Sequence, residues 1–309
     1  MNDAQPSWIG RTIGGRYQIE SLLGRGGMSS VYKATDPNLH RPVAVKIIHP
    51  HLSEHPEFVK RFEQEAAAVA RLRHPNIIQV HDFNHDGDVY YMVLEYVPGE
   101  TLESRLAALR EADLLMPLSD TIRIVTKLCE ALAYAHERKM VHRDVKPSNV
   151  ILNLLGEPIL MDFGIAKIVG GGHVHTATGA TMGTAVYMSP EQVLGEPVDH
   201  RADIYSLGVM LYEMVAGKPP FEGKTAVTVM MKHVNEPVPD IRISNVNIPD
   251  GLAGVLEKAL AKSPADRFQS THEMALVLQQ FLTPPDITPT QSFVGMPAPV
   301  PPSTPVPPA

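Results

Sequence analysis

One short segment of the sequence is rich in glycine: Leu23-Gly-Arg-Gly-Gly-Met-Ser29. Glycine has no Cβ atom, so it lets a hairpin turn sharply and lets backbone N–H groups approach phosphate oxygens. Ser29 replaces the third glycine of a Gly-x-Gly-x-x-Gly pattern, and the Gly-Lys-Ser/Thr ending of a P-loop is missing. The segment therefore predicts a phosphate-binding hairpin or, with equal support, a glycine hairpin without a ligand.

A second feature is a pair of opposite charges in two apolar segments. Lys46 ends the run Pro42-Val-Ala-Val-Lys46, and Glu65 lies on the apolar stripe of a predicted helix, Glu57 to Arg73. The stripe consists of Phe58, Phe62, Val69 and Leu72. Lys46 by itself would be interpreted as an edge-strand lysine in solvent. Because a buried charge is costly unless it is paired, the two residues together predict an ion pair between strand and helix.

The strongest signal comes later in the chain. The run Val141-His-Arg-Asp144-Val-Lys-Pro-Ser-Asn149 is followed by Met161-Asp162-Phe-Gly. In this order these motifs resemble the catalytic loop and the Asp-Phe-Gly motif of the protein kinases, and the resemblance covers residues 17–282. The segment Asp162-Phe-Gly-Ile-Ala-Lys and its neighbours are most similar to the bacterial, eukaryotic-like (Hanks-type) serine/threonine kinases of the receptor-like, membrane-anchored group.

The resemblance implies that four residues act in phosphoryl transfer from ATP. Lys46 would hold the α- and β-phosphates, and Glu65 would fix its position. Asp144 would orient the substrate hydroxyl and accept its proton. Lys146, two residues later, would contact the γ-phosphate, as in Ser/Thr kinases.

ATP and Mg²⁺ are the cofactors that the resemblance implies, with Mn²⁺ as an alternative metal. Asn149 and Asp162 would bind the metal ions, because hard cations prefer oxygen ligands. The residues that would surround ATP are Leu23, Gly24, Gly26, Gly27, Val31, Ala44, Lys46, Glu95, Val97, Ile151 and Met161.

From Asp162 to Glu191 the chain resembles a kinase activation segment, with Ser-Pro-Glu where the family has Ala-Pro-Glu. Glycines and other small residues fill its first half, so we expect disorder there until the segment is phosphorylated. Arg143, beside the catalytic aspartate, supplies a cation that a phosphothreonine could recruit. Any single threonine could also be loop filler. The candidate phosphorylation sites are Thr176, Thr178 and Thr181.

Further structural roles are predicted for residues around the motifs. Asp203 suits an N-cap at the start of an apolar helix, and in the family it also holds the catalytic-loop backbone. By the same resemblance, Glu191 pairs with Arg267. Thr184 resembles the threonine that touches the catalytic aspartate and lysine in Ser/Thr-specific kinases.

Two kinds of lobe are needed to position these residues. Strand patterns dominate first, at 17–23, 30–35, 42–48, 77–81 and 89–95. Helical segments follow at 102–110, 121–138, 203–216, 251–261 and 271–281. The predicted fold class is α+β, the two-lobed protein-kinase fold. It has a small β-rich N-lobe with one key helix, about 17–96, and a larger, mainly helical C-lobe, about 97–282.

The two ends of the chain are predicted to lie outside this domain. Residues 1–16 are interpreted as an N-terminal extension. Residues 283–309 are interpreted as a Pro-rich, disordered linker, because ten of the 28 prolines fall in this stretch. The resemblance allows a membrane anchor only through a segment absent from this chain.

Composition limits the remaining functions. A net charge of -7 and a pI near 6.0 argue against a nucleic-acid binder. The single cysteine, Cys129, is interpreted as a buried apolar residue, and it cannot form an internal disulfide, which favours a reducing compartment. No apolar run reaches the roughly 18 residues of a membrane span. We therefore expect a cytoplasmic kinase domain.

Two other classes compete with an autophosphorylating kinase that acts on protein substrates. A catalytically silent scaffold with the same fold would usually lack one of Lys46, Asp144 and Asp162, and all three are present. A small-molecule phosphotransferase would lack the long activation segment with its threonines. The resemblance also allows a homodimer through the N-lobe.

Overall fold

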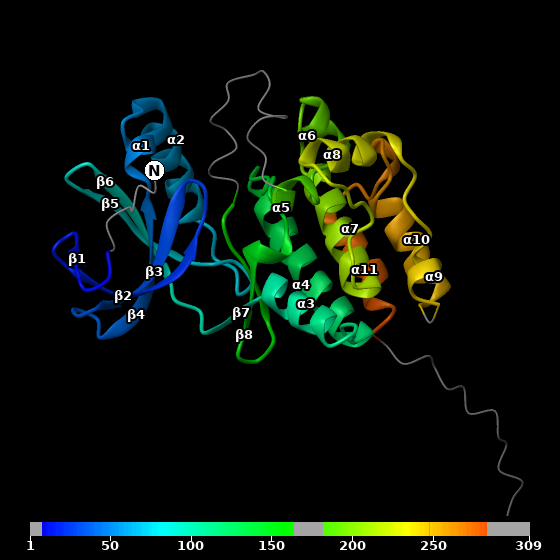
Figure 1. The fold of residues 1–309 in the computed structure, drawn as a ribbon, viewed down its shortest axis with the longest axis horizontal. Coiled ribbons are helices and arrows are strands. Elements are labelled where there is room, and N and C mark those ends of the chain that lie inside the picture. Colours follow the sequence, from blue (N-terminus) through cyan, green and yellow to red (C-terminus); the bar gives the residue numbers. More distant parts are fainter. Residues whose placement is uncertain (1–7, 164–181, 247, 283–309) are drawn as a thin grey trace, which may run out of the picture.

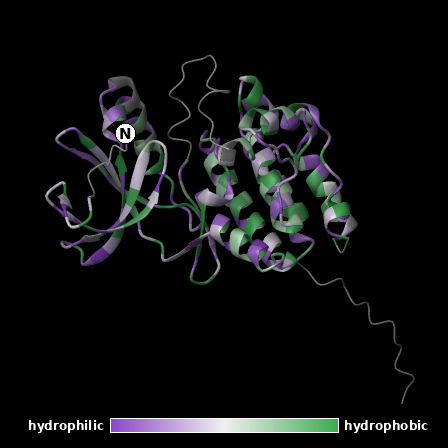
Figure 2. Cartoon of the chain, in the orientation of Figure 1, coloured by the Kyte–Doolittle hydropathy of each residue, from purple (hydrophilic) through white to green (hydrophobic). Residues whose placement is uncertain are grey.

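The computed structural model describes residues 8–163, 182–246 and 248–282, which form a β-rich N-lobe beside a helical C-lobe (Figure 1). This division agrees with the predicted fold class. In Figure 2 the elements of both lobes mix hydrophobic and hydrophilic residues, as elements with one buried side do. Among these residues, no helix is both long enough and apolar enough to cross a membrane.

Six strands form the sheet of the N-lobe, in the order β1-β2-β3-β4-β6-β5, and every neighbouring pair is antiparallel. Their bounds are β1 (Thr12–Ile13), β2 (Tyr17–Arg25), β3 (Ser29–Asp36), β4 (Arg41–Ile48), β5 (Val80–Asp86) and β6 (Val89–Glu95). The first strand was not predicted, although Ile13 is completely buried in the sheet's outer cluster.

Alternation along β4 sends its side chains to two different cores. Val43, Val45 and Ile47 join the outer cluster, which lies on the far side of the sheet from the C-lobe. Ala44 and Ile48 join the larger core that continues into the C-lobe. Lys46 has the parity of Ala44 and Ile48, so it faces the C-lobe.

The N-lobe has two helices, α1 (Pro50–Ser53) and α2 (Pro56–Val69). Phe62, Ala66 and Val69 are buried at spacings of four and three residues, as predicted for one face of a helix. The helix ends earlier than expected, so the buried Leu72 lies in the turn that follows. The side chain of Phe58 lies outside the described part.

The C-lobe is built around α7 (Arg201–Ala216), in which all residues from Ala202 to Val215 are buried. α4 (Leu118–Glu137) packs against α7 and against α11 (Thr271–Gln279). The other helices are α3 (Leu102–Glu111), α5 (Met182–Ala185), α6 (Pro190–Leu194), α8 (Ala226–Asn235), α9 (Ile241–Ser244) and α10 (Asp250–Ala259), with short 3-10 turns at Pro147–Asn149 and Pro264–Asp266.

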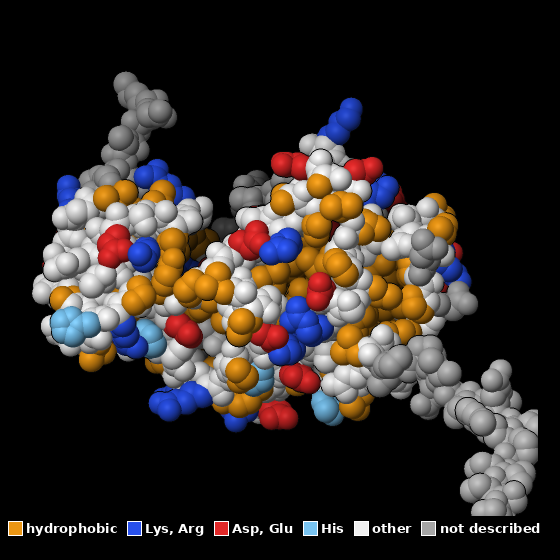
Figure 3. Space-filling view, turned by 90° about the horizontal axis from the view of Figure 1, so that it is seen from below, with side chains coloured by type: hydrophobic (Ala, Val, Ile, Leu, Met, Phe, Trp, Pro, Cys, Tyr) orange, Lys and Arg blue, Asp and Glu red, His pale blue; other side chains and the backbone are white. Residues whose placement is uncertain are grey.

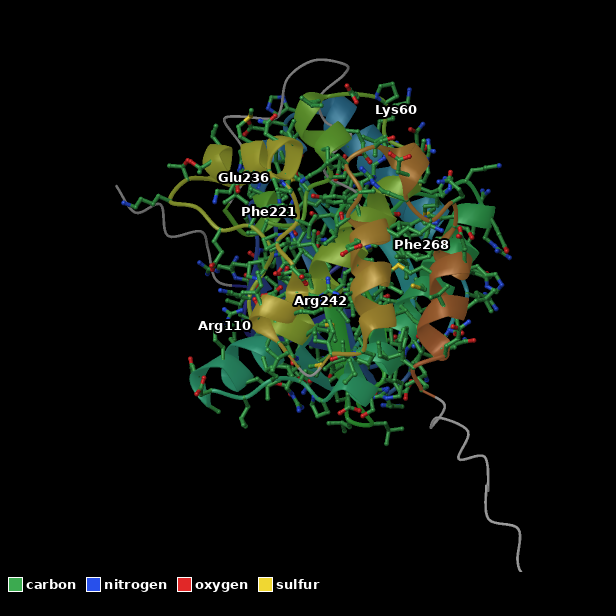
Figure 4. All side chains as sticks on the ribbon, turned by 90° about the vertical axis from the view of Figure 1, so that its right-hand side faces the viewer. Lys60, Arg110, Phe221, Glu236, Arg242 and Phe268 are labelled. Carbon is green, nitrogen blue, oxygen red and sulfur yellow. The ribbon has the colours of Figure 1, made fainter. Side chains whose placement is uncertain are left out.

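Large side chains from the segments that connect the helices also pack into the interior of the C-lobe. Phe221 and Phe268 lie among the helices in Figure 4, and each is only 2% exposed. Cys129 on α4 is buried as predicted, and burial raises the pKa of its thiol. On the face shown in Figure 3, hydrophobic side chains are interspersed with charges of both signs.

A second, smaller sheet lies between the N-lobe and the helices of the C-lobe (Figure 1) and was not predicted. It has the order β7-β8-β9, with β7 (Gly99–Thr101), β8 (Val150–Asn153) and β9 (Pro158–Leu160). The catalytic-loop motif precedes β8 and the Asp-Phe-Gly motif follows β9. This small antiparallel sheet therefore brings the two motifs together.

Candidate active site

The backbone of the catalytic loop is held by Asp203, as the resemblance implied. Its Oδ2 accepts a hydrogen bond from the N–H of His142 at 2.8 Å, and its Oδ1 accepts one from the N–H of Arg143 at 2.7 Å. Oδ2 also lies 2.7 Å from Nε2 of His136. The N-cap prediction for Asp203 is wrong, because α7 begins at Arg201 with His200 as its N-cap. Asp203 lies in the first turn, where its carboxylate can reach the loop.

His142 links the catalytic loop to the Asp-Phe-Gly motif. Its Nε2 lies 2.8 Å from the carbonyl oxygen of Met161, and its Nδ1 accepts from the N–H of Asp144 at 3.2 Å. A carbonyl only accepts, so Nε2 carries the proton. Burial lowers the pKa of His142, which keeps the ring in this neutral form. No role was predicted for this ring. The two hydrogen bonds explain why a histidine is buried in this motif.

Side chains of the loop converge on Asp144. Lys146 Nζ lies 3.0 Å from its Oδ2 and donates to Oγ1 of Thr184 at 3.1 Å. The amide nitrogen of Asn149 donates to the carbonyl oxygen of Asp144 at 2.8 Å. Thr184 comes from α5, so the lysine joins the end of the activation segment to the catalytic loop.

An ion pair joins the two lobes at this point. Lys46 Nζ lies 2.7 Å from Oδ1 of Asp162, and the two side chains are 11% and 40% exposed. The side chain of Glu65, on α2, lies outside the described residues, so its pairing with Lys46 stays a prediction. Asp162 has φ +53° and Arg143 has φ +63°. Such values are uncommon for residues other than glycine, and they tend to occur at functional sites.

Several residues predicted to surround ATP lie in the N-lobe sheet, in β8 or beside Asp162 in the chain. In the N-lobe sheet, Val31 is the cross-strand partner of Lys46. Val31, Val97 and Met161 pack, partly buried, against the core that includes Ala44. Ile151 lies in β8 and is partly exposed. Glu95, at the end of β6, uses its backbone N–H to bond the carbonyl oxygen of Gln79 at 2.9 Å.

The glycine-rich hairpin joins β2 and β3 of the N-lobe sheet. A Cβ atom added at Gly24 or Gly27 would meet no atom within 4 Å, and one at Gly26 would come no closer than 3.7 Å to the Ser29 carbonyl oxygen. None of the three has a φ in the left-handed region. Among the described residues, neither steric crowding nor backbone conformation requires glycine at these three positions. The glycines are therefore better explained by a close approach of the backbone to a ligand. Leu23, at the edge of the hairpin, is 48% exposed.

A buried ion pair supports the end of the activation segment. Two nitrogens of Arg267 donate to the two carboxylate oxygens of Glu191, each at 2.8 Å. The side chains are 0% and 4% exposed. The predicted pair is therefore present, with the bidentate geometry that arginine favours. The candidate phosphorylation sites lie outside the described residues: Thr176, Thr178 and Thr181.

A β-rich lobe and a helical lobe that bring a lysine, two aspartates and an asparagine together define a protein-kinase fold. The comparisons agree: residues 17–279 match the family described as protein kinase domain, and the chain belongs to it.

Named relatives extend this assignment. A probable serine/threonine-protein kinase of Clostridium perfringens, CPE1738, is 41% identical, over 91% of this chain and 40% of the relative. The serine/threonine-protein kinase PknB of Mycobacterium leprae is 42% identical, over 84% of this chain and 42% of the relative. The chain thus spans about 40% of the length of these relatives. Both relatives are named as serine/threonine-protein kinases, the first of them as a probable one.

Solved structures give the same fold. The crystal structure of the Mycobacterium tuberculosis PknI kinase domain is 32% identical, with a TM-score of 0.69. The match covers 88% of this chain and 98% of that one.

Proposed function

We propose that this domain is a serine/threonine protein kinase that transfers the γ-phosphate of ATP to protein hydroxyl groups. The observation that carries the proposal is the contact of Lys146 with both Asp144 and Thr184. This contact places a carboxylate that can accept a proton beside a cation that can hold a phosphate. The division of labour fits phosphoryl transfer, which depends on positioning and on neutralising charge.

Each of the four predicted catalytic residues has a role in the proposed reaction, and backbone groups bind adenine. Asp144 orients the acceptor hydroxyl and takes its proton, while Lys146 contacts the γ-phosphate. Lys46 holds the α- and β-phosphates, and Glu65 on α2 supports it. For adenine, Glu95 offers its carbonyl oxygen, since its N–H is bonded within the protein. Val97 offers the neighbouring backbone group.

Asn149 and Asp162 fit a divalent metal ion. The amide nitrogen of Asn149 is engaged by the carbonyl oxygen of Asp144, which leaves its side-chain oxygen for a cation. The carboxylate of Asp162 supplies the second oxygen donor, and hard cations such as Mg²⁺ prefer such donors. When bound, the metal would neutralise charge on the phosphates. Mg²⁺ is proposed as the metal, with Mn²⁺ as the alternative.

Regulation is proposed to act through phosphorylation of the activation segment. A phosphate on Thr176, Thr178 or Thr181 would add about two negative charges to the segment. Arg143, beside Asp144, could then bind this phosphate. The chain would phosphorylate itself and other proteins, in the cytoplasm. Assembly as an N-lobe homodimer and membrane attachment through a further segment belong to the same proposal.

The test is incorporation of labelled phosphate from ATP and Mg²⁺ into the chain and into a generic protein substrate. Asp144→Asn should lose at least about 99% of the activity, because a proton acceptor typically contributes 10²- to 10⁴-fold, and it should still bind ATP. Asp113→Asn, the same change at an exposed site, is the matched control. Mass spectrometry should locate the label on the activation-segment threonines. A folded, ATP-binding chain that labels nothing would contradict the proposal.

A further inference from the structure

His49 connects the sheet to the glycine-rich hairpin through three contacts. It follows β4 and stands at the N-cap position of α1, but its side chain makes no capping bond. Its backbone N–H donates to the carbonyl oxygen of Met28 at 2.9 Å. Nδ1 lies 3.2 Å from the carbonyl oxygen of Gly27, and Nε2 lies 3.2 Å from Oγ of Ser30.

The partners fix the protonation of the ring. A carbonyl oxygen only accepts, so Nδ1 carries the proton and donates to Gly27, and Nε2 of the neutral ring accepts from the Ser30 hydroxyl. Burial lowers the pKa of His49, the hydrogen bond to Gly27 raises it, and the neighbouring side chains of His51 and Arg25 lower it, so that its net shift is downward. Both ring nitrogens are therefore used in the neutral form.

His49 and Ser30 lie on the outer face of the sheet. Ser30 is the cross-strand partner of Ile47, which belongs to the outer cluster, and partners share a face. Along the chain, His49 has the parity of Ile47, whereas Lys46 has the opposite parity and faces the C-lobe. The histidine and the lysine that is proposed to bind phosphate are thus on opposite faces.

This placement orients the backbone of the hairpin. In a trans peptide the N–H points away from the C=O of the same unit, and the structure has no cis peptide among the residues it describes. The side-chain bond from Nδ1 of His49 draws the carbonyl of Gly27 toward the outer face, whereas the backbone bond from His49 to Met28 lies in the plane of the sheet. The N–H of Met28, in the same peptide unit as the Gly27 carbonyl, is therefore directed to the opposite side, which is the side of Lys46.

We propose that His49 is a positioning residue that holds the glycine-rich hairpin with the N–H of Met28 toward the phosphates of ATP. The inference rests on the proposed kinase function. Glycines at positions 24, 26 and 27 leave the tip free to adopt many conformations, so a bond to the tip itself reduces the entropy lost when ATP is bound. Ser30 completes this arrangement by fixing the second nitrogen of the ring.

The test separates ATP binding from the rest of the reaction. His49→Ala should raise the KM for ATP about tenfold, as loss of one to two hydrogen bonds would, and leave the KM for a protein substrate unchanged. Ser30→Ala should raise the KM for ATP by a smaller factor, about threefold. The amide of glutamine can still donate to Gly27, so the KM for ATP of His49→Gln should lie between those of the original chain and His49→Ala. His272→Ala, the same change at an exposed histidine on α11, should match the original chain.

The outcomes distinguish this inference from the proposed function. If the original chain transfers no phosphate, the proposed function fails, and ATP affinity measured by calorimetry still tests the hairpin. If the chain is active and both His49→Ala and Ser30→Ala keep its KM for ATP within twofold, the inference is overturned. An equal rise in the KM for ATP in His272→Ala, or an equal rise in the KM for protein substrate in His49→Ala, would also overturn it, since either would indicate a general structural effect.

Discussion

Arg267→Ala should strongly destabilise the C-lobe. The guanidinium group has five N–H donors, and the structure gives it five acceptors. Two are the carboxylate oxygens of Glu191, and three are the carbonyl oxygens of Ala261, Arg201 and Lys262, at 2.8 to 3.0 Å. Alanine would leave the carboxylate, which is 4% exposed, without a cation.

Breaking a buried pair by removing one partner costs about 3 to 5 kcal/mol. The m-value is the slope of the unfolding free energy against urea concentration. With an m-value at the upper end of the range for small proteins, this loss of stability lowers the midpoint of urea unfolding by about 1 to 2 M. Circular dichroism at 222 nm reports on the helices of the C-lobe and suits the measurement. Arg267→Lys keeps the charge but has only three donors, so its midpoint should fall between those of the original chain and the alanine variant.

The matched control is an exposed ion pair of similar length. Lys258 Nζ lies 2.7 Å from Oε1 of Glu273, and the two side chains are 45% and 42% exposed. Lys258→Ala should cost less than about 1 kcal/mol, because water screens exposed pairs. If Arg267→Ala costs no more than Lys258→Ala, burial does not determine the strength of these pairs and the reasoning is refuted.

Three further predictions concern the loop and the core. Asp203→Asn should lower kcat about 10- to 100-fold, since bonds from the loop backbone to a carboxylate weaken, and steady-state kinetics measures this. Thr184→Val should lower kcat several-fold while Thr184→Ser retains it, because only the hydroxyl serves Lys146. His233 has a pKa lowered to about 4 by burial. The unfolded chain therefore binds this proton at a higher pH than the folded chain does, and His233 alone should lower the stability by about 2 kcal/mol from pH 7 to pH 5. His233→Asn should remove this part of the slope in urea titrations at both pH values.

Elements with a strong internal pattern could be predicted from the sequence. The run Val89-Tyr-Tyr-Met-Val-Leu-Glu95 gave β6 with correct bounds, because buried aromatic and β-branched residues favour a central strand. The neighbouring β5 was placed too early, at 77–81. It is the edge of the sheet, where few side chains need to be buried, and its sequence after Val80 is mostly polar.

Elements that depend on tertiary contacts could not be predicted. The strands of the small sheet have three or four residues each, which is too short for a period to show. The helix α8, Ala226–Asn235, has three consecutive β-branched residues after its first residue and was not predicted. Its one local signal is Thr225, whose side chain caps the helix by accepting from the N–H of Thr228. Packing against α6 supplies the rest.

The site shows the same difference between local and distant information. Its motif residues could be found from the sequence, but their contacts could not, because Lys46 and Asp162 are 116 positions apart. Lys46 is much the more buried of the two, so it bears most of the cost of losing water and depends more on its partner. In the proposed reaction Lys46 would contact phosphate oxygens and Asp162 would hold a metal ion that supplies positive charge. Each residue would then exchange one opposite charge for another, so we expect ATP and metal to bind together at a lower cost than either alone.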